Sequence, residues 1–137
     1  IAFFVMRGNS NKNNNGTQQA NQENVTEEYV QKLEDGSKLN VSEELRKTKT
    51  LDGLEFTNIQ LKEIGGITTL LADVENKTSS ATNEKVVSVK ILDKSGNTIT
   101  ELKGIIDSLQ PSAKSQLNIA VTADVANAYN FEISNAK

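Results

Sequence analysis

A repeated alternation of apolar and polar residues constrains the fold of this chain more than any other feature. Strict period-two alternation puts one face of a strand in a core and the other in water, which is typical of antiparallel sheets. The sequence therefore predicts a mainly β protein, in which intervening polar residues such as Ser88 and Lys90 face solvent. Four rows of alternate residues are expected to face inward: Thr68, Leu70, Ala72 and Val74; Val87, Val89 and Ile91; Leu117, Ile119, Val121 and Ala123; and Tyr129, Phe131 and Ile133.

The segment at residues 54–63 changes phase part-way along. Leu54 and Phe56 share one phase of the alternation, whereas Ile59 and Leu61 share the other. Because a one-residue slip turns side chains to the opposite face of a strand, the sequence predicts a bulge or bend near residues 57–58. First strands of sandwiches often cross between sheets at such a bend.

Turn residues divide the chain into short strands. Gly65-Gly66, residues 76–80 and residues 93–97 separate apolar runs, and Pro111, the only proline, is expected to stop a strand. The cluster at residues 93–97 is a hairpin signal. Short strands at a spacing of about 8–12 residues indicate a sandwich or a barrel.

Residues 25–50 admit two interpretations. Residues 29–33 and 38–41 can pair across a turn at 34–37, which is the favoured interpretation, or a helix can span residues 26–34. A helical turn or two is expected from Ser42 onward, because serine is a good N-cap and the acidic residues after it complement the helix dipole. Any helix is expected before residue 50.

The first 24 residues differ from the rest of the chain. Residues 1–7 are six apolar residues and Arg7, interpreted as the end of a transmembrane or signal-anchor segment, with a short buried strand as the alternative. Arg7 would then lie outside the membrane, against the positive-inside tendency. Residues 8–24 are rich in Asn, Gln, Gly and Ser. They are expected to form a disordered linker, because they have little apolar surface to offset their ordering entropy.

The composition excludes several classes of site. The 137 residues include no Cys, His or Trp. The chain therefore has no disulfide or thiol nucleophile, and it lacks the commonest general base and metal ligand. The net charge is −3, and the 15 Lys and Arg residues form no run. No basic field draws the protein to nucleic acid, and no cofactor is expected.

Three patterns that suggest chemistry are better explained by structure. Asp73 and Glu75 lie on one face of a predicted strand, where solvated carboxylates explain them better than a hydrolase pair does. The oxygen-rich turn at residues 93–97 lacks the ligand spacing of an EF-hand loop, although Asp93 leaves weak calcium binding open. Ser134 and Lys137 have the spacing of a Ser–Lys pair, but no helix is predicted there to present them.

Four short segments carry a resemblance to a known family: Val74–Thr78, Val89–Asp93 with Gly96, Leu109–Pro111 and Tyr129–Phe131. Together they resemble bacterial immunoglobulin-like domains of the FxLYD type, whose name describes aromatic-x-Leu-aromatic-Asp. Only Asp93 matches that motif strictly, and Ser112 replaces the usual glycine after the proline. The resemblance implies an extracytoplasmic β-sandwich without catalytic residues, commonly attached to a membrane anchor in Gram-positive bacteria.

These observations predict an all-β, immunoglobulin-like antiparallel β-sandwich of about seven strands at residues 51–137. A short N-terminal hairpin and helical turn at residues 25–50 precede it, after the anchor at 1–7 and the linker at 8–24. The protein is expected outside the cell, tethered to the membrane only by its N-terminal segment. The sequence does not set the oligomeric state and favours a monomer slightly.

The predicted function is a non-catalytic binding or spacer module of the bacterial cell envelope, with an unknown protein or cell-wall partner. The alternatives are an accessory domain of a membrane complex that binds by edge-strand addition, and a secreted hydrolase. Binding is expected at loop tips, because sandwiches place variable loops at their ends. The candidate residues are Glu63, Gly65, Gly66, Asn76, Lys77, Asn83, Asp124 and Asn127.

Overall fold

The computed structural model describes residues 27–136, which contain nine strands and one short helix. The anchor predicted at residues 1–7 and the linker predicted at residues 8–24 lie outside the described residues. The helix begins at residue 43, before residue 50 as expected. In chain order the elements are β1 (Val30–Lys32), β2 (Lys38–Asn40), α1 (Glu43–Arg46), β3 (Lys49–Leu51), β4 (Leu54–Ile64), β5 (Ile67–Asn76), β6 (Lys85–Leu92), β7 (Thr98–Ile106), β8 (Lys114–Val121) and β9 (Asn130–Asn135).

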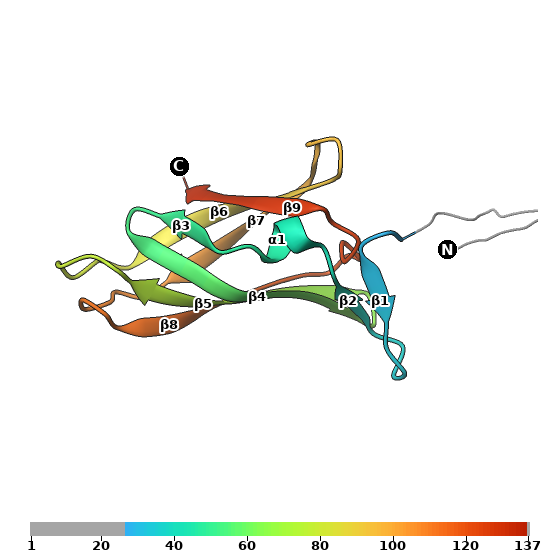
Figure 1. Cartoon of the computed structure of the whole chain (residues 1–137), viewed down its shortest axis with the longest axis horizontal. Helices are drawn as coiled ribbons and strands as arrows, with labels where there is room; N and C mark the ends of the chain where they lie inside the picture. Colours follow the sequence, from blue (N-terminus) through green and yellow to red (C-terminus); the bar gives the residue numbers. More distant parts are fainter. Residues whose placement is uncertain (1–26, 137) are drawn as a thin grey trace, which may run out of the picture.

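The strands form two antiparallel sheets that face each other (Figure 1). The larger sheet has six strands in the order β1-β2-β4-β5-β8, with β3 also paired to β4. The smaller sheet has three strands in the order β7-β6-β9 and lies above the larger one in Figure 1. The predicted all-β antiparallel sandwich is confirmed. Six strands, β4 to β9, lie within residues 51–137, close to the seven expected there, and β3 begins two residues earlier, after the hairpin β1–β2 and the helix α1.

The predicted inward rows meet between the sheets and form the core. The rows of β5 and β6 are almost completely buried. One prediction about these strands is wrong: Ser88, expected in solvent, is buried. Its hydroxyl donates to the carboxylate of Glu101 on the neighbouring strand β7. Ala123 is exposed, although it belongs to a predicted inward row, because β8 ends at Val121.

Strand β4 contains the predicted bulge. Its register with β5 shifts between Thr57 and Gln60, and Asn58 has a φ of 50°. The bulge restores the phase of the alternation, so that Leu54 and Phe56 before it and Ile59 and Leu61 after it all face the core. β4 pairs with β5 on both sides of the bulge, and it therefore stays in the larger sheet.

Residues 27–50 form the hairpin and the helical turn. The alternative interpretation, a helix across residues 26–34, is wrong, because β1 occupies that segment. Ser42 is the N-cap of α1, and its hydroxyl accepts the N–H of Leu45 at 3.4 Å. β2 pairs with β4, and Leu45 is fully buried in the core. The N-terminal elements are therefore part of the sandwich.

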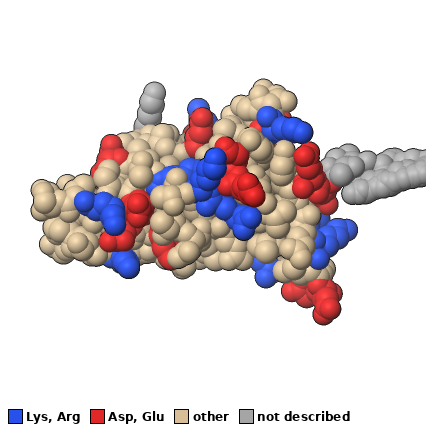
Figure 2. Space-filling model, in the orientation of Figure 1, with Lys and Arg blue, Asp and Glu red and all other residues tan. Residues whose placement is uncertain are grey.

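The sandwich has a covered side and an open side. On the covered side, α1 and β3 lie against β9, and the Ser42 hydroxyl donates to the Tyr129 carbonyl at 2.5 Å. Figure 2 shows this side, where basic and acidic side chains lie together over α1 and β3. On the open side, β7 and β8 each pair with a single neighbour. They approach closely at Gly104, where a Cβ would lie 2.6 Å from Cδ1 of Ile119.

Candidate functional site

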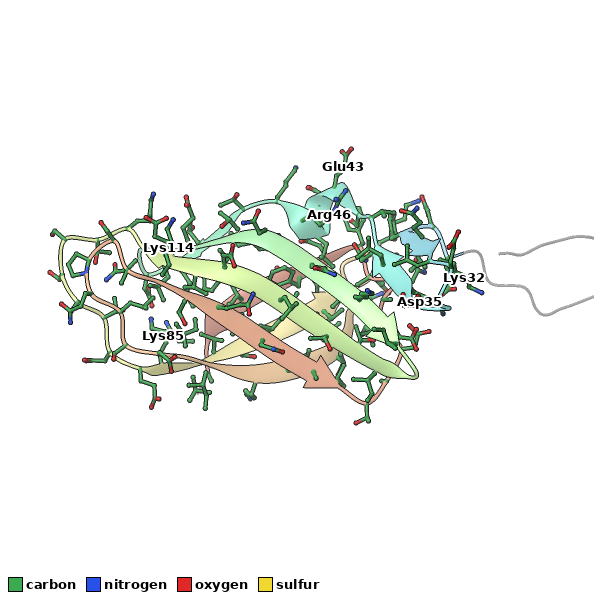
Figure 3. The ribbon with its side chains drawn as sticks, turned by 90° about the horizontal axis from the view of Figure 1, so that it is seen from below. Lys32, Asp35, Glu43, Arg46, Lys85 and Lys114 are labelled. Atoms are coloured by element: carbon green, nitrogen blue, oxygen red, sulfur yellow. The ribbon has the colours of Figure 1, made fainter. Side chains whose placement is uncertain are left out.

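The predicted loop residues lie at two opposite ends of the sandwich. Figure 3 labels Lys32 and Asp35 at one end, termed the hairpin end, and Lys85 and Lys114 at the other, termed the crossover end. The structure therefore does not bring the predicted residues together as one site. At the hairpin end are Glu63, Gly65, Gly66, Asp124 and Asn127, and at the crossover end are Asn76, Lys77 and Asn83.

At the crossover end, Asn76 holds the loop that follows β5. Its side chain is completely buried. Its amide nitrogen donates to the carbonyls of Ser80 and Leu109 at 2.9 and 3.1 Å, and its oxygen accepts a backbone N–H two residues on at 2.9 Å. Lys77 and Asn83 are exposed, with the Lys77 Nζ 3.7 and 3.9 Å from carboxylates on β5 and β4. The amide of Asn76 is therefore used within the fold.

At the hairpin end, Asp124 and Asn127 tie the loop after β8 to the N-terminal hairpin. The Nζ of Lys38 donates to Asp124 at 2.5 Å and to Glu27 at 2.9 Å. Burial lowers the pKa of Lys38, but the two carboxylates raise it more, so that it lies above the ordinary value of 10.5. The Oδ1 of Asn127 accepts the N–H of Tyr29 at 2.8 Å. Both predicted residues are thus engaged inside the protein.

The turn between β4 and β5 has the geometry of a tight hairpin. Ile64 pairs with Ile67, and the two residues between them, Gly65 and Gly66, have φ values of 60° and 87°. Two successive residues with positive φ form a type I′ turn, which glycine adopts without strain. Glu63 is buried beneath the turn, and its carboxylate accepts the N–H of Gly66 at 2.6 Å. Glu63 therefore supports the turn and is not an exposed loop-tip residue.

Next to this turn, the outer face of the larger sheet is apolar. Ile64 and Ile67 are neighbours across the hairpin, and their exposed fractions are 57% and 45%. Leu71 lies on the same face, and the surface forms an open groove of about 520 Å³. This surface is termed the hairpin-tip face, and it is lined by Gln60, Lys62, Ile64, Ile67, Thr69 and Leu71.

The sequence located the turn of this face but not its apolar side chains. The inward row of β4 includes Leu61, so Ile64 falls in the outward phase of that strand. The inward row of β5 begins at Thr68, so Ile67 also falls in the outward phase. Two apolar residues in the outward phase on either side of a tight turn are the signal that could have identified the face.

The hairpin-tip face carries a positive charge near its middle. Lys62 lies between Leu39 of β2 and Thr69 of β5 in the register of the sheet. Hydrogen bonds from Ser37 are the main cause of the lowered pKa of Asp35, and Lys62 lowers it further by its charge. The face can therefore accept an apolar surface that carries a carboxylate.

The aromatic side chains of the described residues are placed in or against the core. Phe56 and Phe131 are buried. Tyr29 and Tyr129 are half-buried and pack against each other, with ring centroids 5.3 Å apart. Within residues 27–136 there is therefore no exposed aromatic platform of the kind that stacks on flat ligand rings such as nucleobases.

The oxygen-rich turn at residues 93–97 forms the predicted hairpin between β6 and β7. The Oδ1 of Asp93 accepts the N–H groups of Ser95 and Asn97 at 3.0 and 2.9 Å. These bonds give Asp93 a structural role in the turn. Weak calcium binding there stays a prediction.

The smaller sheet carries a polar cluster on its outer face. The buried Ser88 donates to Glu101, and this bond is the main cause of the lowered pKa of Glu101. A lowered pKa makes this carboxylate a weaker base for activating the serine. Over residues 27–136, no group of three or more acidic side chains could hold a metal ion, and no helix is long and apolar enough to span a membrane.

Comparisons with protein-family models, with curated proteins and with solved structures find no match to this chain. The resemblance to FxLYD-type domains therefore stays a prediction from the four short segments of the sequence that carry it. The functional inference rests on the hairpin-tip face.

Proposed function

We propose that this protein is a non-catalytic binding module of the cell envelope, held outside the membrane by its N-terminal segment. Its binding surface is the hairpin-tip face, and its partner is a protein. The observation that carries the proposal is the pair of exposed isoleucines, Ile64 and Ile67, side by side on the outer face of the larger sheet.

An exposed pair of isoleucines at this position is typical of a surface that binds a partner. The outer face of an antiparallel sheet is ordinarily polar where it meets water. A single exposed apolar residue needs no explanation, whereas a contiguous apolar patch with a polar rim is typical of an interaction site. Here Ile64 and Ile67 form the apolar pair, and the polar pair of Lys62 and Thr69 borders it on the side toward Leu71.

The geometry of the turn prepares this surface for binding. The type I′ turn and the bond from Gly66 to Glu63 hold the two strand ends in one arrangement. The hydroxyl of Thr68 donates to the Ala123 carbonyl and accepts the N–H of Val125, which fixes the start of β5 to the loop after β8. A surface ordered before binding loses less conformational entropy when its partner docks.

The chemistry of the face favours a protein partner over a cell-wall polysaccharide. Aliphatic side chains around Lys62 fit an apolar segment that carries an acidic residue. The described residues offer no exposed aromatic ring for stacking, since their tyrosines and phenylalanines are buried or half-buried. The expected partner is therefore an apolar protein surface with a carboxylate that meets Lys62.

A second candidate function, an accessory domain that binds by strand addition, has an observation of its own. β7 and β8 each have one unpaired edge on the open side. Unpaired strand edges accept a strand from another chain. β7 belongs to the smaller sheet, so binding there can be separated from binding at the hairpin-tip face.

Affinity capture with paired variants tests the proposal. The full chain is immobilised and exposed to membrane and surface proteins of the source cells, and affinities for the captured proteins are then measured singly. The variant Ile64→Asp/Ile67→Asp is expected to weaken binding of the specific partner by at least about tenfold, because it removes two apolar anchors. Lys62→Glu is expected to weaken it less, because it reverses one exposed charge.

The matched control is Ala81→Asp, which places the same charge on an exposed residue at the crossover end. It is expected to leave partner binding unchanged. Circular dichroism and thermal melts check that all variants fold. Equal binding by the wild type and the Ile64→Asp/Ile67→Asp variant would show that the hairpin-tip face is not the binding surface.

A further inference from the structure

Strand β7 presents a long unpaired edge on the open side of the sandwich. It has nine residues and pairs only with β6. Natural edge strands usually carry features that block further pairing, such as prolines or charges pointing inward. β7 has no proline, its inward residues carry no charge, and its one irregularity in pairing with β6 lies near its start, at Ile99. Its outward residues are Ile99, Glu101, Lys103 and Ile105, all of them exposed.

The four outward residues of β7 form a symmetric pattern: an isoleucine at each end and two residues of opposite charge between them. In an antiparallel pair of β7 strands centred on Leu102, Ile99 of one copy lies opposite Ile105 of the other. Glu101 lies opposite Lys103, and the two-fold axis repeats both contacts. Directly opposite side chains in an antiparallel pair have Cβ atoms about 4.5–5.5 Å apart. Each isoleucine therefore meets an isoleucine, and each charge meets its opposite.

The charges also select this register over its neighbours. If the centre moves to Glu101, each Glu101 faces Glu101, and if it moves to Lys103, each Lys103 faces Lys103. Like charges directly opposite each other destabilise a strand pair. A register shifted by an odd number of residues from the one centred on Leu102 places the outward side chains of one copy opposite the inward side chains of the other. Pairing about Leu102 is thus the favoured arrangement.

The same pairing covers the exposed apolar residues of the smaller sheet. Val86 lies directly opposite Ile105 on the outer face, and their exposed fractions are 48% and 60%. Ile99 has an exposed fraction of 45%. In the pair of β7 strands, Ile99 of the second copy extends the row formed by Val86 and Ile105. Two such apolar rows form, one on either side of the charge pairs.

The other long or accessible edges lack this self-complementarity. The outward residues of β8 are Lys114, Gln116, Asn118 and Ala120, and none is acidic. In β9, the outward Glu132 has no basic outward neighbour on its strand, and α1 and β3 lie against β9 on the covered side.

We propose that two copies of this protein associate through their β7 strands, antiparallel and centred on Leu102, in a two-fold symmetric dimer. The smaller sheets of the two copies then form one continuous sheet. Such self-complementary contacts are the usual form of a two-fold interface. Because a single strand per copy forms it, the interface is small and the dimer is expected to depend on protein concentration.

Sedimentation of the full chain over a concentration series tests the dimer. The wild type is expected to shift from monomer to dimer as concentration rises. Lys103→Glu turns both charge pairs of the dimer into like-charge contacts and is expected to raise the dissociation constant at least about tenfold. Glu101→Lys should do the same. The exchange variant Glu101→Lys/Lys103→Glu restores opposite charges and is expected to restore the dimer.

Cysteine cross-linking tests the register, since the chain has no cysteine of its own. A mixture of Ile99→Cys and Ile105→Cys chains is expected to form a disulfide-linked dimer, because these positions lie opposite each other across the interface. Each variant alone pairs its cysteine with an isoleucine and is expected to cross-link far more slowly.

Three results would overturn the proposal: a monomer at every concentration, a Lys103→Glu variant that dimerises like the wild type, or an exchange variant that stays dissociated. Association through the N-terminal apolar segment would not respond to these charges, since every variant retains that segment. Ile64→Asp/Ile67→Asp is expected to leave the dimer intact. Failure of the dimer and failure of partner binding at the hairpin-tip face are therefore distinguishable.

Discussion

The covered and open sides of this sandwich differ in how far the protein's own residues cover their strand edges. On the covered side, Lys49 of β3 crosses a groove of about 570 Å³ to lie over the ring of Phe131 in β9, 4.7 Å from its centroid. Burial there lowers the pKa of Lys49. At the far end of β9, the side chain of Asn135 donates to Asp52 at 2.7 Å. On the open side, by contrast, β8 packs beside β7 without pairing with it, closely enough that a Cβ at Gly104 would lie 2.6 Å from Cδ1 of Ile119.

The difference shows how a short N-terminal segment changes which edges are available. Residues 42–52 supply Ser42, Lys49 and Asp52 to the covered side, so that β9 is occupied by contacts from its own chain. Within residues 27–136, β8 packs beside β7, but no strand pairs with the outer edge of β7. A strand edge that is covered by its own chain cannot pair with another chain, whereas an uncovered strand edge can. The open side is thus where a second chain can be added.

The largest expected effect tests whether the open side shares the core. Ile119 of β8 is 5% exposed, whereas its neighbour Asn118 faces solvent. Ile119→Asp buries an unpaired carboxylate and loses apolar contact, each costing several kcal/mol. Against a total stability of about 5–15 kcal/mol, the variant is expected to unfold or nearly so. Asn118→Asp should change stability by about 0.5 kcal/mol or less. Thermal melts compare them, and equal losses would mean that both faces of β8 are buried.

The next largest effect tests whether the helix α1 stabilises the covered side. Leu45 is the fully buried residue of α1, which contacts β4 and β9. Leu45→Ala is expected to lower the free energy of unfolding by about 2–5 kcal/mol. Arg46→Ala, on the exposed face of the same helix, is expected to cost about 0.5 kcal/mol. Urea unfolding measures both. If Leu45→Ala costs as little as Arg46→Ala, the helix does not close this side.

A smaller effect tests the contact between β7 and β8. Gly104→Ala adds a methyl group 2.6 Å from Cδ1 of Ile119. Overpacking of this kind costs about 1–3 kcal/mol. Ile119→Ala removes both Cδ1 and Cγ1, which would lie 2.6 and 2.8 Å from the new methyl group, so the double variant should lose less stability than the sum of the two single variants. Chemical denaturation of the four proteins gives the coupling. Additive losses would indicate that the two strands do not touch there.

The smallest effect concerns the ion pairs that fasten the N-terminal hairpin to the loop after β8. The pKa of Lys38 is raised, so the protonated lysine stabilises the fold. This stabilisation is fully present below pH 10.5, the ordinary pKa, and is lost as the pH rises through the higher pKa of the folded state. Lys38→Met should be less stable than the wild type below that pH, and the difference should shrink above it. Lys114→Met on the exposed start of β8 is the control. A constant difference between wild type and Lys38→Met would argue against the ion pairs.

Local patterns in the sequence predicted much of the fold. The inward rows apart from Ala123, the bulge after Phe56, the hairpin at residues 93–97 and the N-cap at Ser42 agree with the structure. Each depends on a few neighbouring residues, because side-chain periodicity, turn conformation and helix capping are set within a short segment.

The candidate site was predicted only in part, because it depends on residues that are distant in the chain. The turn Gly65-Gly66 is visible in the sequence, but the burial of Glu63 and Asn76 is not. Asn76 is buried because it meets the carbonyl of Leu109, 33 residues away in the chain. No local pattern specifies such a partner.

Period-two alternation is enough to specify a mainly β sandwich with alternating faces, because it can be recognised in the residues alone. Which outward surfaces stay uncovered depends on contacts between distant segments. Ile64 meets Ile67 because β4 and β5 pair, and the outer edge of β7 is unpaired because β7 is the end strand of its sheet. Which strands become neighbours depends on packing across the whole chain, so the surfaces available to partners emerge only when the two sheets have formed.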